Sequence, residues 1–363
     1  MESARREGID LVVVGPEIPL AGGIVDRFQE TGIPIFGPSK LAAEIESSKV
    51  FSKGLMQKYG IPSAWSQSFS DYEKARAYLE AQKAPIVVKA DGLAAGKGVV
   101  VAETIPEALD FLKDVMENRA FGDSGNQVII EECLTGREMS SFAFTNGKTV
   151  VPMVSACDYK PAYDGNTGPN TGGMGSYSPP HFATPELYRT VNETILKPTV
   201  KALAEEGRPY KGVLYGGSMI TPEGPKVLEF NARFGDPETQ VVLPRLKTDL
   251  IDIMLAVTNE SLDRIEIAWS DDPCVGVVLA SGGYPGKYQT GFPISGLEDV
   301  DEDVMVFHAG TKLKDGQVVT SGGRVLSVVA TGKTLSEARD KAYDNVKRIN
   351  FEGRYFRRDI ALI

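Results

Sequence analysis

The sequence predicts a mixed α/β and α+β protein of several lobes, and three observations support that prediction. Apolar runs at 9–14, interrupted only by Asp10, and at 33–36 flank a helical segment, which is typical of parallel strands joined through helices. Farther along the chain, capping-box patterns open helices that alternate with apolar strands. At 363 residues the chain is also longer than one small domain, since domains commonly hold about 100 to 200 residues.

Residues 1–50 are predicted to form a partial Rossmann-like domain. The two apolar runs end at Gly15-Pro16-Glu17 and Gly37-Pro38-Ser39, and the helix between them covers about 23–30. Open α/β sheets bind ligands at the carboxyl ends of such strands. Because only two strands precede the change of pattern near residue 40, we expect this sheet to be incomplete.

Residues 51–270 are predicted to form a second domain, whose lid subdomain spans about 64–132. Capping boxes at 70–73 and 104–107 open two lid helices, and lid strands are expected at 86–89 and 128–131. The other predicted elements are a helix over 40–59, a hairpin turn at Asn146-Gly147, mostly helix over 184–206, antiparallel strands at 213–220 and 226–233, and a helix over 249–258.

Residues 271–363 are predicted to form a small, separate α+β domain. Asp271-Asp272-Pro273 has the composition of a linker. Strands and glycine turns follow it, and the capping box Thr334-Leu335-Ser336-Glu337 opens a final helix.

The composition excludes several classes of protein. There are 39 basic and 49 acidic residues, a net charge of −10, so the basic excess of a nucleic-acid-binding protein is missing. No apolar run approaches the roughly 20 residues that span a bilayer, and the start has no signal-peptide core, so we expect a cytoplasmic protein without membrane segments. The three cysteines lie far apart and only two histidines exist, which argues against a disulfide framework, a zinc site or a histidine triad.

The most informative segment is the predicted strand at 227–233. Side chains alternate along a strand, so Glu229, Asn231 and Arg233 share one face. Leu228, Phe230 and Ala232 share the other face, which is apolar and is predicted to pack. Carboxylate and amide oxygens suit Mg²⁺, while Arg233 can hold a transferring phosphoryl group or an acyl-phosphate oxygen. The structural alternative is an exposed amphipathic strand.

A glycine-rich segment at 91–98 comes just after the predicted strand that Lys89 ends. Its glycines and alanines let backbone N–H groups approach a polyphosphate, and Lys89 and Lys97 add positive charge. A Walker A loop is excluded because Gly98 stands where the hydroxyl residue belongs. A surface hairpin is the alternative; the flanking lysines favour phosphate binding.

Three more segments have the character of binding loops. Glu131-Glu132-Cys133-Leu134 ends a strand and turns towards Glu138, a hinge whose backbone can pair with an adenine edge. Taken by itself, this segment is better explained as a plain strand and turn. The segments 167–175 and 233–240 have too little apolar content for a core, so both are predicted to be substrate-binding loops.

Taken together, these segments resemble the ATP-grasp superfamily and, within it, the glycinamide ribonucleotide synthetase family. The matching motifs are 12–17, 88–98, 167–175, 229–240 and 280–286, and they extend over nearly the whole chain. The resemblance implies an ATP-grasp fold, the small-molecule substrates ATP, glycine and 5-phosphoribosylamine, a Mg²⁺ or Mn²⁺ ion, and a monomer or homodimer.

The resemblance also implies roles for individual residues. Arg233 and Asp236 would be catalytic, and Glu229 and Asn231 would bind the metal. The implied ATP-binding residues are Lys53, Lys89, Gly92, Gly96, Lys97, Gly98, Glu131, Glu132, Leu134 and Glu138. The implied substrate-binding residues are Asp158, Lys160, Asn170, Thr171, Gly172, Gly173 and Pro237.

The implied reaction is the second step of de novo purine synthesis, in which ATP, glycine and 5-phosphoribosylamine give glycinamide ribonucleotide, ADP and phosphate. A carboxylate that attacks a γ-phosphate meets strong anion repulsion, so the site needs a metal and cationic residues more than an acid–base group. Glycyl phosphate would hydrolyse in water, which explains a closing lid.

The chain departs from the family pattern in two places. Many ATP-grasp enzymes carry another metal-binding acid on the strand paired with Glu229, but 215–219 has none, so we predict a metal shell of Glu229, Asn231, phosphates and water. The family begins with a strand and a glycine-rich turn that help to bind the phosphoribosylamine phosphate, and about two β–α units, roughly 60 residues, are expected to be missing here.

Two other functions stay open at this point. One is a truncated nucleotide-binding fragment without turnover. The other is an ATP-grasp carboxylase of the same pathway, which the long glycine-ligase-like motifs disfavour.

Overall fold

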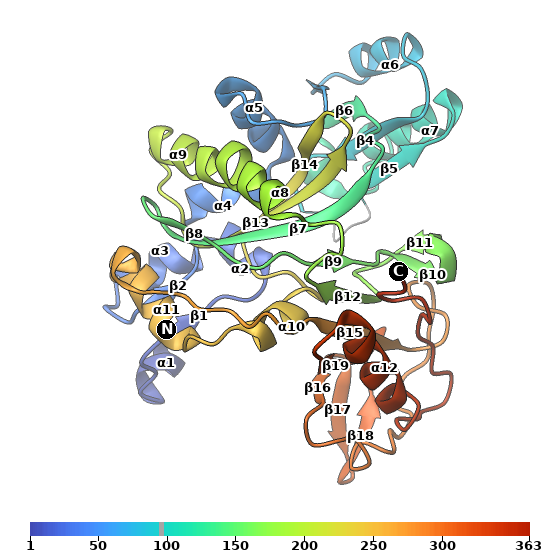
Figure 1. The fold of residues 1–363 in the computed structure, drawn as a ribbon. Coiled ribbons are helices and arrows are strands. Elements are labelled where there is room, and N and C mark those ends of the chain that lie inside the picture. Colours follow the sequence, from blue (N-terminus) through green and yellow to red (C-terminus); the bar gives the residue numbers. More distant parts are fainter. Residues whose placement is uncertain (94–97) are drawn as a thin grey trace. The chain divides into compact units, whose positions relative to one another are not determined.

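A computed structural model describes residues 1–93 and 98–363 of the chain (Figure 1). The chain forms two compact units, each assembled from three segments of the sequence. Unit 1 comprises Met1–Met153, Thr184–Phe234 and Leu250–Glu266, and unit 2 comprises Val154–Ala183, Gly235–Asp249 and Ile267–Ile363.

Unit 1 begins with helix α1 (Glu2–Arg6) and a two-stranded parallel sheet of β1 (Val12–Val13) and β2 (Ile35–Phe36). Between these strands lie α2 (Glu17–Ala21) and α3 (Ile24–Gln29), so the predicted arrangement of parallel strands joined through helix is confirmed.

The helix predicted over 40–59 is in fact two helices, α4 (Lys40–Ser47) and α5 (Lys49–Tyr59). Ser48 leaves the helical conformation, and its hydroxyl accepts a hydrogen bond from the Phe51 N–H at 3.1 Å. Ser48 therefore caps α5, as serine commonly does at helix N-termini.

The segment predicted to be a lid, 64–132, forms an antiparallel sheet in the order β3-β6-β4-β5, with α6 and α7 packed side by side against it (Figure 1). Its elements are β3 (Ser66–Phe69), α6 (Tyr72–Glu80), β4 (Ile86–Ala90), β5 (Val99–Ala102), α7 (Ile105–Met116) and β6 (Val128–Glu132). The predicted capping box at 70–73 is wrong in one respect, because Asp71 and not Ser70 caps α6 by accepting from the Lys74 N–H at 2.9 Å.

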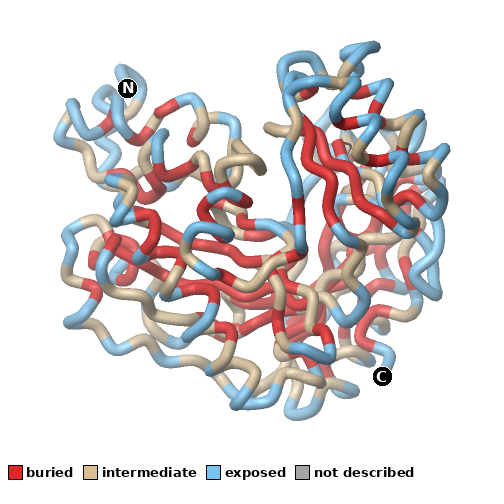
Figure 2. Tube along the Cα trace, turned by 90° about the horizontal axis from the view of Figure 1, so that it is seen from above, coloured by how far each residue is buried: buried red, intermediate tan, exposed pale blue. Residues whose placement is uncertain are grey.

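The larger sheet of unit 1 has the order β14-β13-β7-β8 and is antiparallel throughout. Figure 2 shows buried positions running along the strands of the molecule. The elements are β7 (Arg137–Asn146), β8 (Val150–Pro152), α8 (Pro185–Val191), α9 (Lys197–Glu205), β13 (Lys211–Thr221), β14 (Gly224–Asn231) and α11 (Leu250–Thr258). A π-helical turn at Asn192–Leu196 joins α8 to α9, so the predicted long helical stretch is confirmed.

Strand β14 contains a bulge that the sequence did not reveal. Gly217 pairs with Glu229 and Ser218 pairs with Val227, so Leu228 is an extra residue on β14. Leu228 is consequently only half-buried, whereas Val227 and Phe230 are buried, which corrects the prediction that Leu228 packs with Phe230 on one apolar face.

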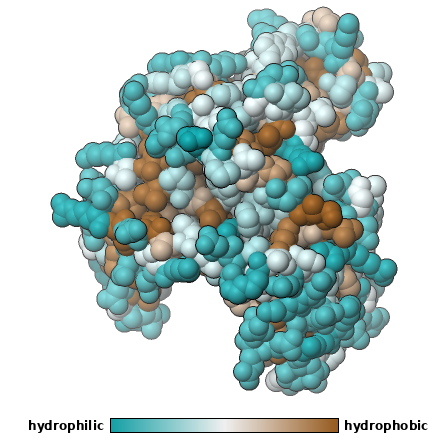
Figure 3. All heavy atoms as spheres, viewed as in Figure 1, coloured by the Kyte–Doolittle hydropathy of each residue, from teal (hydrophilic) through white to brown (hydrophobic). Residues whose placement is uncertain are grey.

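Unit 2 is built on an antiparallel sheet in the order β16-β19-β15-β12-β9, against which α12 packs. Its elements are β9 (Cys157–Asp158), β10 (Pro161–Tyr163), β11 (Thr167–Asn170), β12 (Gly175–Ser178), α10 (Thr239–Val242), β15 (Cys274–Ala280), β16 (Met305–His308), β17 (Thr311–Lys314), β18 (Gln317–Thr320), β19 (Arg324–Thr331) and α12 (Leu335–Val346). The outer face of α12 is hydrophilic (Figure 3), and the predicted capping box of Thr334 and Glu337 is present.

The prediction of an irregular loop over 167–175 is wrong for its first part. Thr167–Asn170 is strand β11, which pairs with β10. Gly165 and Asn166, with φ of 70° and 56°, make the left-handed turn that lets this hairpin close. Residues 171–174 remain irregular.

Among the described residues, no helix is both long enough and apolar enough to cross a membrane.

Candidate active site

Two buried lysines of unit 1 share one buried glutamate. Lys53 on α5 places Nζ 2.6 Å from Glu131 Oε2, and Lys89 on β4 forms an ion pair with the other oxygen, Oε1. The three residues are 4 %, 8 % and 2 % exposed. Strands β4 and β6 are neighbours in the lid sheet, which brings Lys89 and Glu131 together.

This cluster carries more positive than negative charge. Lys53 Nζ lies at ion-pair distance from Glu131 but lacks hydrogen-bond geometry to any described residue. Burial lowers the pKa of Lys53, although Glu131 opposes that effect. Burial raises the pKa of Glu131, but the charges of Lys89 and Lys53 outweigh it and hold this pKa below its usual range. The excess positive charge of two buried ammonium groups on one carboxylate favours the binding of an anion such as a phosphate.

The start of the glycine-rich loop is fastened to the N-terminus of α5. Asp91 accepts hydrogen bonds from the Val50 N–H at 3.1 Å and from the Ser48 hydroxyl at 3.3 Å. Lys49 donates to the carbonyls of Ala90 at 3.2 Å and Gly92 at 2.7 Å. Burial lowers the pKa of Lys49 more than the nearby Glu229 raises it.

Contacts of Gly92 and Gly98 fix the two ends of the glycine-rich segment. Gly92 has φ +91°, and a Cβ there would lie 2.7 Å from the Ser124 hydroxyl, so the position requires glycine. At the other end, the Gly98 carbonyl accepts from the Ala90 N–H at 2.8 Å. The predicted residues Gly96 and Lys97 lie outside the described residues.

The hinge predicted to hold adenosine connects the two sheets of unit 1. It runs from Glu132, at the end of β6, through the half-buried Leu134 to Glu138 on β7. Gly136 is required there, because a Cβ would lie 2.2 Å from the Ile220 carbonyl oxygen. Glu132 accepts from the Trp65 N–H at 3.0 Å, which fixes this strand end.

The end of β14 presents the predicted metal ligands. Glu229 is exposed and Asn231 is half-buried, and their alternation places them on one face. Gly217 and Tyr215 lie opposite them on β13, so the paired strand adds no carboxylate at these positions. Lys89 donates to the neighbouring Leu228 carbonyl at 3.3 Å, which brings the lysine cluster to this strand.

These donors fit a hard divalent cation. One carboxylate and one amide oxygen are the ligand types that Mg²⁺ and Mn²⁺ take, and an ion of this kind keeps substrate phosphates and waters in its remaining positions. No group of three or more His, Cys, Asp or Glu with metal-binding geometry occurs within residues 1–93 and 98–363, so such an ion would depend on those further oxygens.

Arg233 is held between two glutamates that the sequence did not single out for any role. Its Nε lies 3.5 Å from Glu17 and its Nη2 lies 3.5 Å from Glu46. Glu46 also accepts from the Ala232 N–H at 2.7 Å. Burial raises the pKa of Glu46 to about 7, although Arg233 and that N–H lower it. The Gly-Pro-Glu motif at 15–17 was a signal for Glu17, whereas nothing in the helical pattern around Glu46 indicated this contact.

Unit 2 contains the other half of the predicted residues. Asp158 and Lys160 form an ion pair of 3.5 Å, and the Thr171 hydroxyl donates to the Lys160 carbonyl at 2.7 Å. Gly173 packs so closely on Pro237 that a Cβ would lie 2.3 Å from Pro237 Cδ. Asp236 pairs with Arg324 at 2.9 Å. Asn170 is exposed at the end of β11.

The structure therefore gathers the predicted residues into two groups. Lys53, Lys89, Glu131, Glu229, Asn231 and Arg233 belong to unit 1, and Asp158, Lys160, Thr171, Gly172, Gly173, Asp236 and Pro237 belong to unit 2. Sequence reasoning missed Lys49, Glu46, Tyr284 and Arg324. Tyr284 stands in the motif at 280–286, which was noted without a role.

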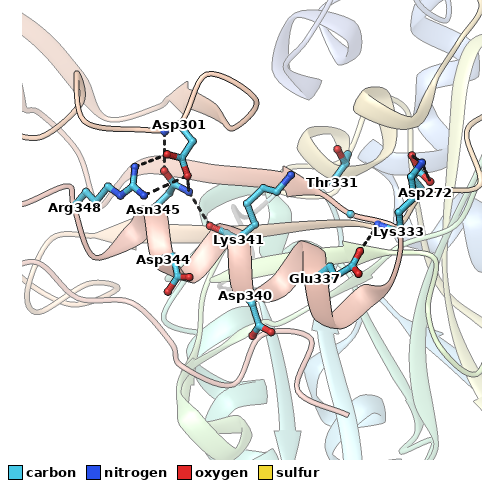
Figure 4. A pocket seen from close by; sticks show the side chains of 11 residues that line it. Asp272, Asp301, Thr331, Lys333, Glu337, Asp340, Lys341, Asp344, Asn345 and Arg348 are labelled. Atoms are coloured by element: carbon cyan, nitrogen blue, oxygen red, sulfur yellow. Dashed lines mark hydrogen bonds and ion pairs between the residues drawn. The ribbon is translucent and has the colours of Figure 1, made fainter.

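A separate hollow of about 590 Å³ along α12 has a different character (Figure 4). Figure 4 shows that Arg348 and Asn345 both contact Asp301. The ion pair of Arg348 measures 2.6 Å and the hydrogen bond of Asn345 measures 3.0 Å. Lys333 pairs with Asp272 at 3.0 Å and Lys341 with Asp303 at 2.7 Å. Its basic side chains are thus matched by neighbouring acids, as on an ordinary solvated surface.

Comparison with known families decides where this chain belongs. Residues 47–239 match the ATP-grasp (A) domain of phosphoribosylglycinamide synthetase, residues 1–46 match its N domain and residues 274–362 match its C domain. The chain belongs to the phosphoribosylglycinamide synthetase family. The predicted family resemblance is confirmed.

Relatives within the phosphoribosylglycinamide synthetase family match almost the whole chain. A phosphoribosylamine–glycine ligase of Halalkalibacterium halodurans is 52% identical over 359 residues, which are 99% of this chain and 83% of that protein. One of Vibrio parahaemolyticus is 50% identical over 360 residues, 99% of this chain and 84% of that protein.

Solved structures confirm the ATP-grasp fold. The crystal structure of a phosphoribosylamine–glycine ligase from Thermotoga maritima superposes with a TM-score of 0.83 at 37% identity, covering 90% of this chain and 81% of that one. The biotin carboxylase domain of a Hydrogenobacter thermophilus 2-oxoglutarate carboxylase has a TM-score of 0.77 at 16% identity, with 98% and 77% covered, and shows the fold alone.

Proposed function

We propose that this chain is a carbon–nitrogen ligase that joins glycine to 5-phosphoribosylamine at the expense of ATP, giving glycinamide ribonucleotide, ADP and phosphate. The observation that supports it best is the buried cluster in which Lys53 and Lys89 share Glu131, close to Glu229 and Asn231 on β14. This combination of excess positive charge and oxygen ligands suits a metal-bound polyphosphate.

The chemistry begins with the glycine carboxylate. One carboxylate oxygen attacks the γ-phosphorus of ATP, the bond to the β-phosphate oxygen breaks, and ADP leaves. The product, glycyl phosphate, is then attacked at its carbonyl carbon by the amine, which forms the amide bond, loses a proton and releases phosphate. Both steps depend more on positioning and charge than on an acid–base residue.

The residues of unit 1 would bind and orient the nucleotide. Lys53 and Lys89 bind the phosphates, while Glu131 holds both ammonium groups in place. Lys49 and Asp91 fasten the base of the loop that covers the phosphates. Backbone groups of Glu132 and Leu134, with the Glu138 carboxylate, bind adenosine.

The remaining residues would serve the metal and the acyl phosphate. Glu229 and Asn231 would hold a divalent cation, which supplies neutralising charge to the phosphate oxygens. Arg233, with its guanidinium held by Glu17 and Glu46, stabilises oxygens of the transferring group. In unit 2, Asp158, Lys160, Asp236, Pro237 and residues 170–173 bind glycine and the acyl phosphate.

Three finer points belong to the same proposal. The metal is Mg²⁺ or Mn²⁺, the protein is a monomer or homodimer, and it acts in the cytoplasm. Activity with each metal separately and sedimentation velocity of the purified protein test the first two points.

The proposal is tested by following ADP release with ATP, Mg²⁺, glycine and freshly prepared phosphoribosylamine. Release that needs both glycine and the amine is expected. ATP binding without turnover would instead identify a nucleotide-binding fragment, and turnover when bicarbonate replaces glycine would identify a carboxylase.

A further inference from the structure

Arg324, the first residue of β19, contacts both parts of the proposed glycine site in unit 2. Its Nη1 donates to the Gly172 carbonyl at 2.7 Å and to the Asp236 carbonyl at 3.0 Å. Its Nη2 donates to Asp236 Oδ2 at 2.9 Å. A single guanidinium thus joins the irregular segment at 171–174 to Asp236, two segments far apart in the sequence.

Tyr284 holds the same peptide segment from the other side. Its hydroxyl accepts a hydrogen bond from the Gly172 N–H at 3.1 Å. The tyrosine is itself fixed, because its N–H donates to the Ser281 carbonyl at 3.1 Å and its ring lies against Gly323, where a Cβ would be 2.2 Å from Tyr284 Cδ2. Tyr284 of the motif at 280–286 therefore holds Gly172 in place, a role that the proposed reaction does not include.

The backbone beside Gly172 leaves little freedom. Gly173 has φ +110°, and a Cβ there would overlap Pro237. The Gly173 N–H donates to the Thr171 hydroxyl at 2.9 Å, and the Met174 N–H donates to the Tyr159 carbonyl at 2.8 Å. The N–H and the carbonyl of Gly172 are thus held by Tyr284 and Arg324, side chains from elsewhere in the chain.

We infer that Arg324 and Tyr284 are positioning residues that clamp Gly172 between them and so hold residues 171–173 against Asp236 and Pro237 in the shape that binds glycine. This inference rests on the function proposed above. The planar guanidinium suits the task because it donates to a carbonyl and a carboxylate at once, which a lysine ammonium on its flexible stem does less well.

The test measures KM and kcat of the full-length protein with Arg324→Met, Arg324→Lys, Tyr284→Phe and the double variant Arg324→Met with Tyr284→Phe. We expect Arg324→Met to raise the KM for glycine by about tenfold or more, because a lost hydrogen bond to a charged group is worth about one power of ten or more. The KM for ATP stays unchanged, and Arg324→Lys recovers part of the loss.

The double variant separates positioning from a general loss of stability. Because both side chains hold one residue, the double variant should raise the KM for glycine by less than the product of the two single-variant increases. Arg348→Met is the matched control, since Arg348 is an arginine of unit 2 that pairs with Asp301 away from Asp236. Its KM for glycine should equal that of the unaltered protein.

Failure of the inference can be told from failure of the proposed function. If the unaltered protein releases no glycine-dependent ADP, the proposed function fails. If it does, but Tyr284→Phe and Arg324→Lys keep its KM for glycine, the inference is overturned. A rise confined to the KM for phosphoribosylamine, or effects that multiply fully in the double variant, would also overturn it. Tyr284→Phe and Arg324→Lys are conservative changes, so these two variants still decide the test if Arg324→Met does not fold.

Discussion

Lys53 Nζ and Glu131 Oε2 lie 2.6 Å apart, and the two side chains are only 5% and 3% exposed. Lys89 pairs with the second oxygen of the same carboxylate. Two buried ammonium groups, one from α5 and one from the lid, therefore depend on one glutamate. The lid and the α5 segment are linked at the place where the phosphates are proposed to bind.

Glu131→Gln should destabilise the protein. The change leaves two buried ammonium groups without their carboxylate, and breaking a buried ion pair from one side commonly lowers the free energy of unfolding by about 3 to 5 kcal/mol. Urea denaturation in the absence of nucleotide measures this difference. Glu206→Gln is the control, because it breaks a more exposed pair with Lys58 and should have a much smaller effect. Equal effects of the two changes would contradict the role given to Glu131.

Lys89→Ala should raise the KM for ATP by about ten- to a hundredfold, since a hydrogen bond to a charged group is worth about 1.5 to 3 kcal/mol. Steady-state kinetics with saturating glycine and amine measure this effect. Lys83→Ala removes an exposed lysine of the same lid and should leave the KM for ATP unchanged. An unchanged KM in Lys89→Ala would exclude a phosphate contact.

Glu229→Gln should shift the metal requirement and leave the fold intact. The glutamate is exposed, so its loss removes no packing, but an amide is a poorer ligand for a hard cation than a carboxylate. We expect the Mg²⁺ concentration for half-maximal activity to rise about tenfold or more.

Glu223→Gln is the matched control for that experiment, because Glu223 is an exposed glutamate in the turn that joins β13 to β14. Activity at limiting Mg²⁺ is the quantity to compare. Equal activity of Glu229→Gln and Glu223→Gln would refute the metal assignment.

Glu46 should make stability depend on pH. Burial raises its pKa to about 7 from 4.5, so the folded protein holds this proton more tightly than the unfolded chain. The stability from this group is complete below about pH 4.5 and is lost as pH rises through about 7. Glu46→Gln cannot ionise and escapes this loss.

Urea denaturation of both proteins at about pH 5 and about pH 8 measures the effect. The free energy of unfolding of Glu46→Gln, relative to the unaltered protein, should rise between these values by up to about 3 kcal/mol, since one pKa unit is about 1.4 kcal/mol. A difference that is the same at both pH values would contradict the burial of a protonated Glu46.

Much of the fold could be predicted because local patterns determine it. The period-2 pattern and turn signals located β13 and β14, and Thr334 with Glu337 marked the start of α12. The break at Ser48 was missed because the helical pattern continues through it, although serine is a common N-cap and Ser48 caps α5 by accepting from the Phe51 N–H. The β14 bulge was missed because no particular residue type in the sequence marks the extra residue of a strand.

The candidate site could be predicted only where residues stand together in the sequence. Glu229, Asn231 and Arg233 were identifiable from their alternation, and Lys89 from its glycine-rich loop. Glu46 accepts from the N–H of Ala232, which lies 186 residues away in the sequence. Arg324 donates to the carbonyl of Asp236, which lies 88 residues away. Folding alone brings such partners together, so a single sequence carries no signal for them.

The central claim is that ATP activates the carboxylate of glycine, and an oxygen label tests it most directly. Glycine labelled with ¹⁸O in its carboxylate is incubated with the protein, ATP, Mg²⁺ and phosphoribosylamine, and the released phosphate is analysed by ³¹P NMR. We predict that one labelled oxygen appears in each phosphate, because the attacking carboxylate oxygen stays with the phosphoryl group when the amide forms. Unlabelled phosphate released together with glycinamide ribonucleotide would contradict the acyl-phosphate mechanism.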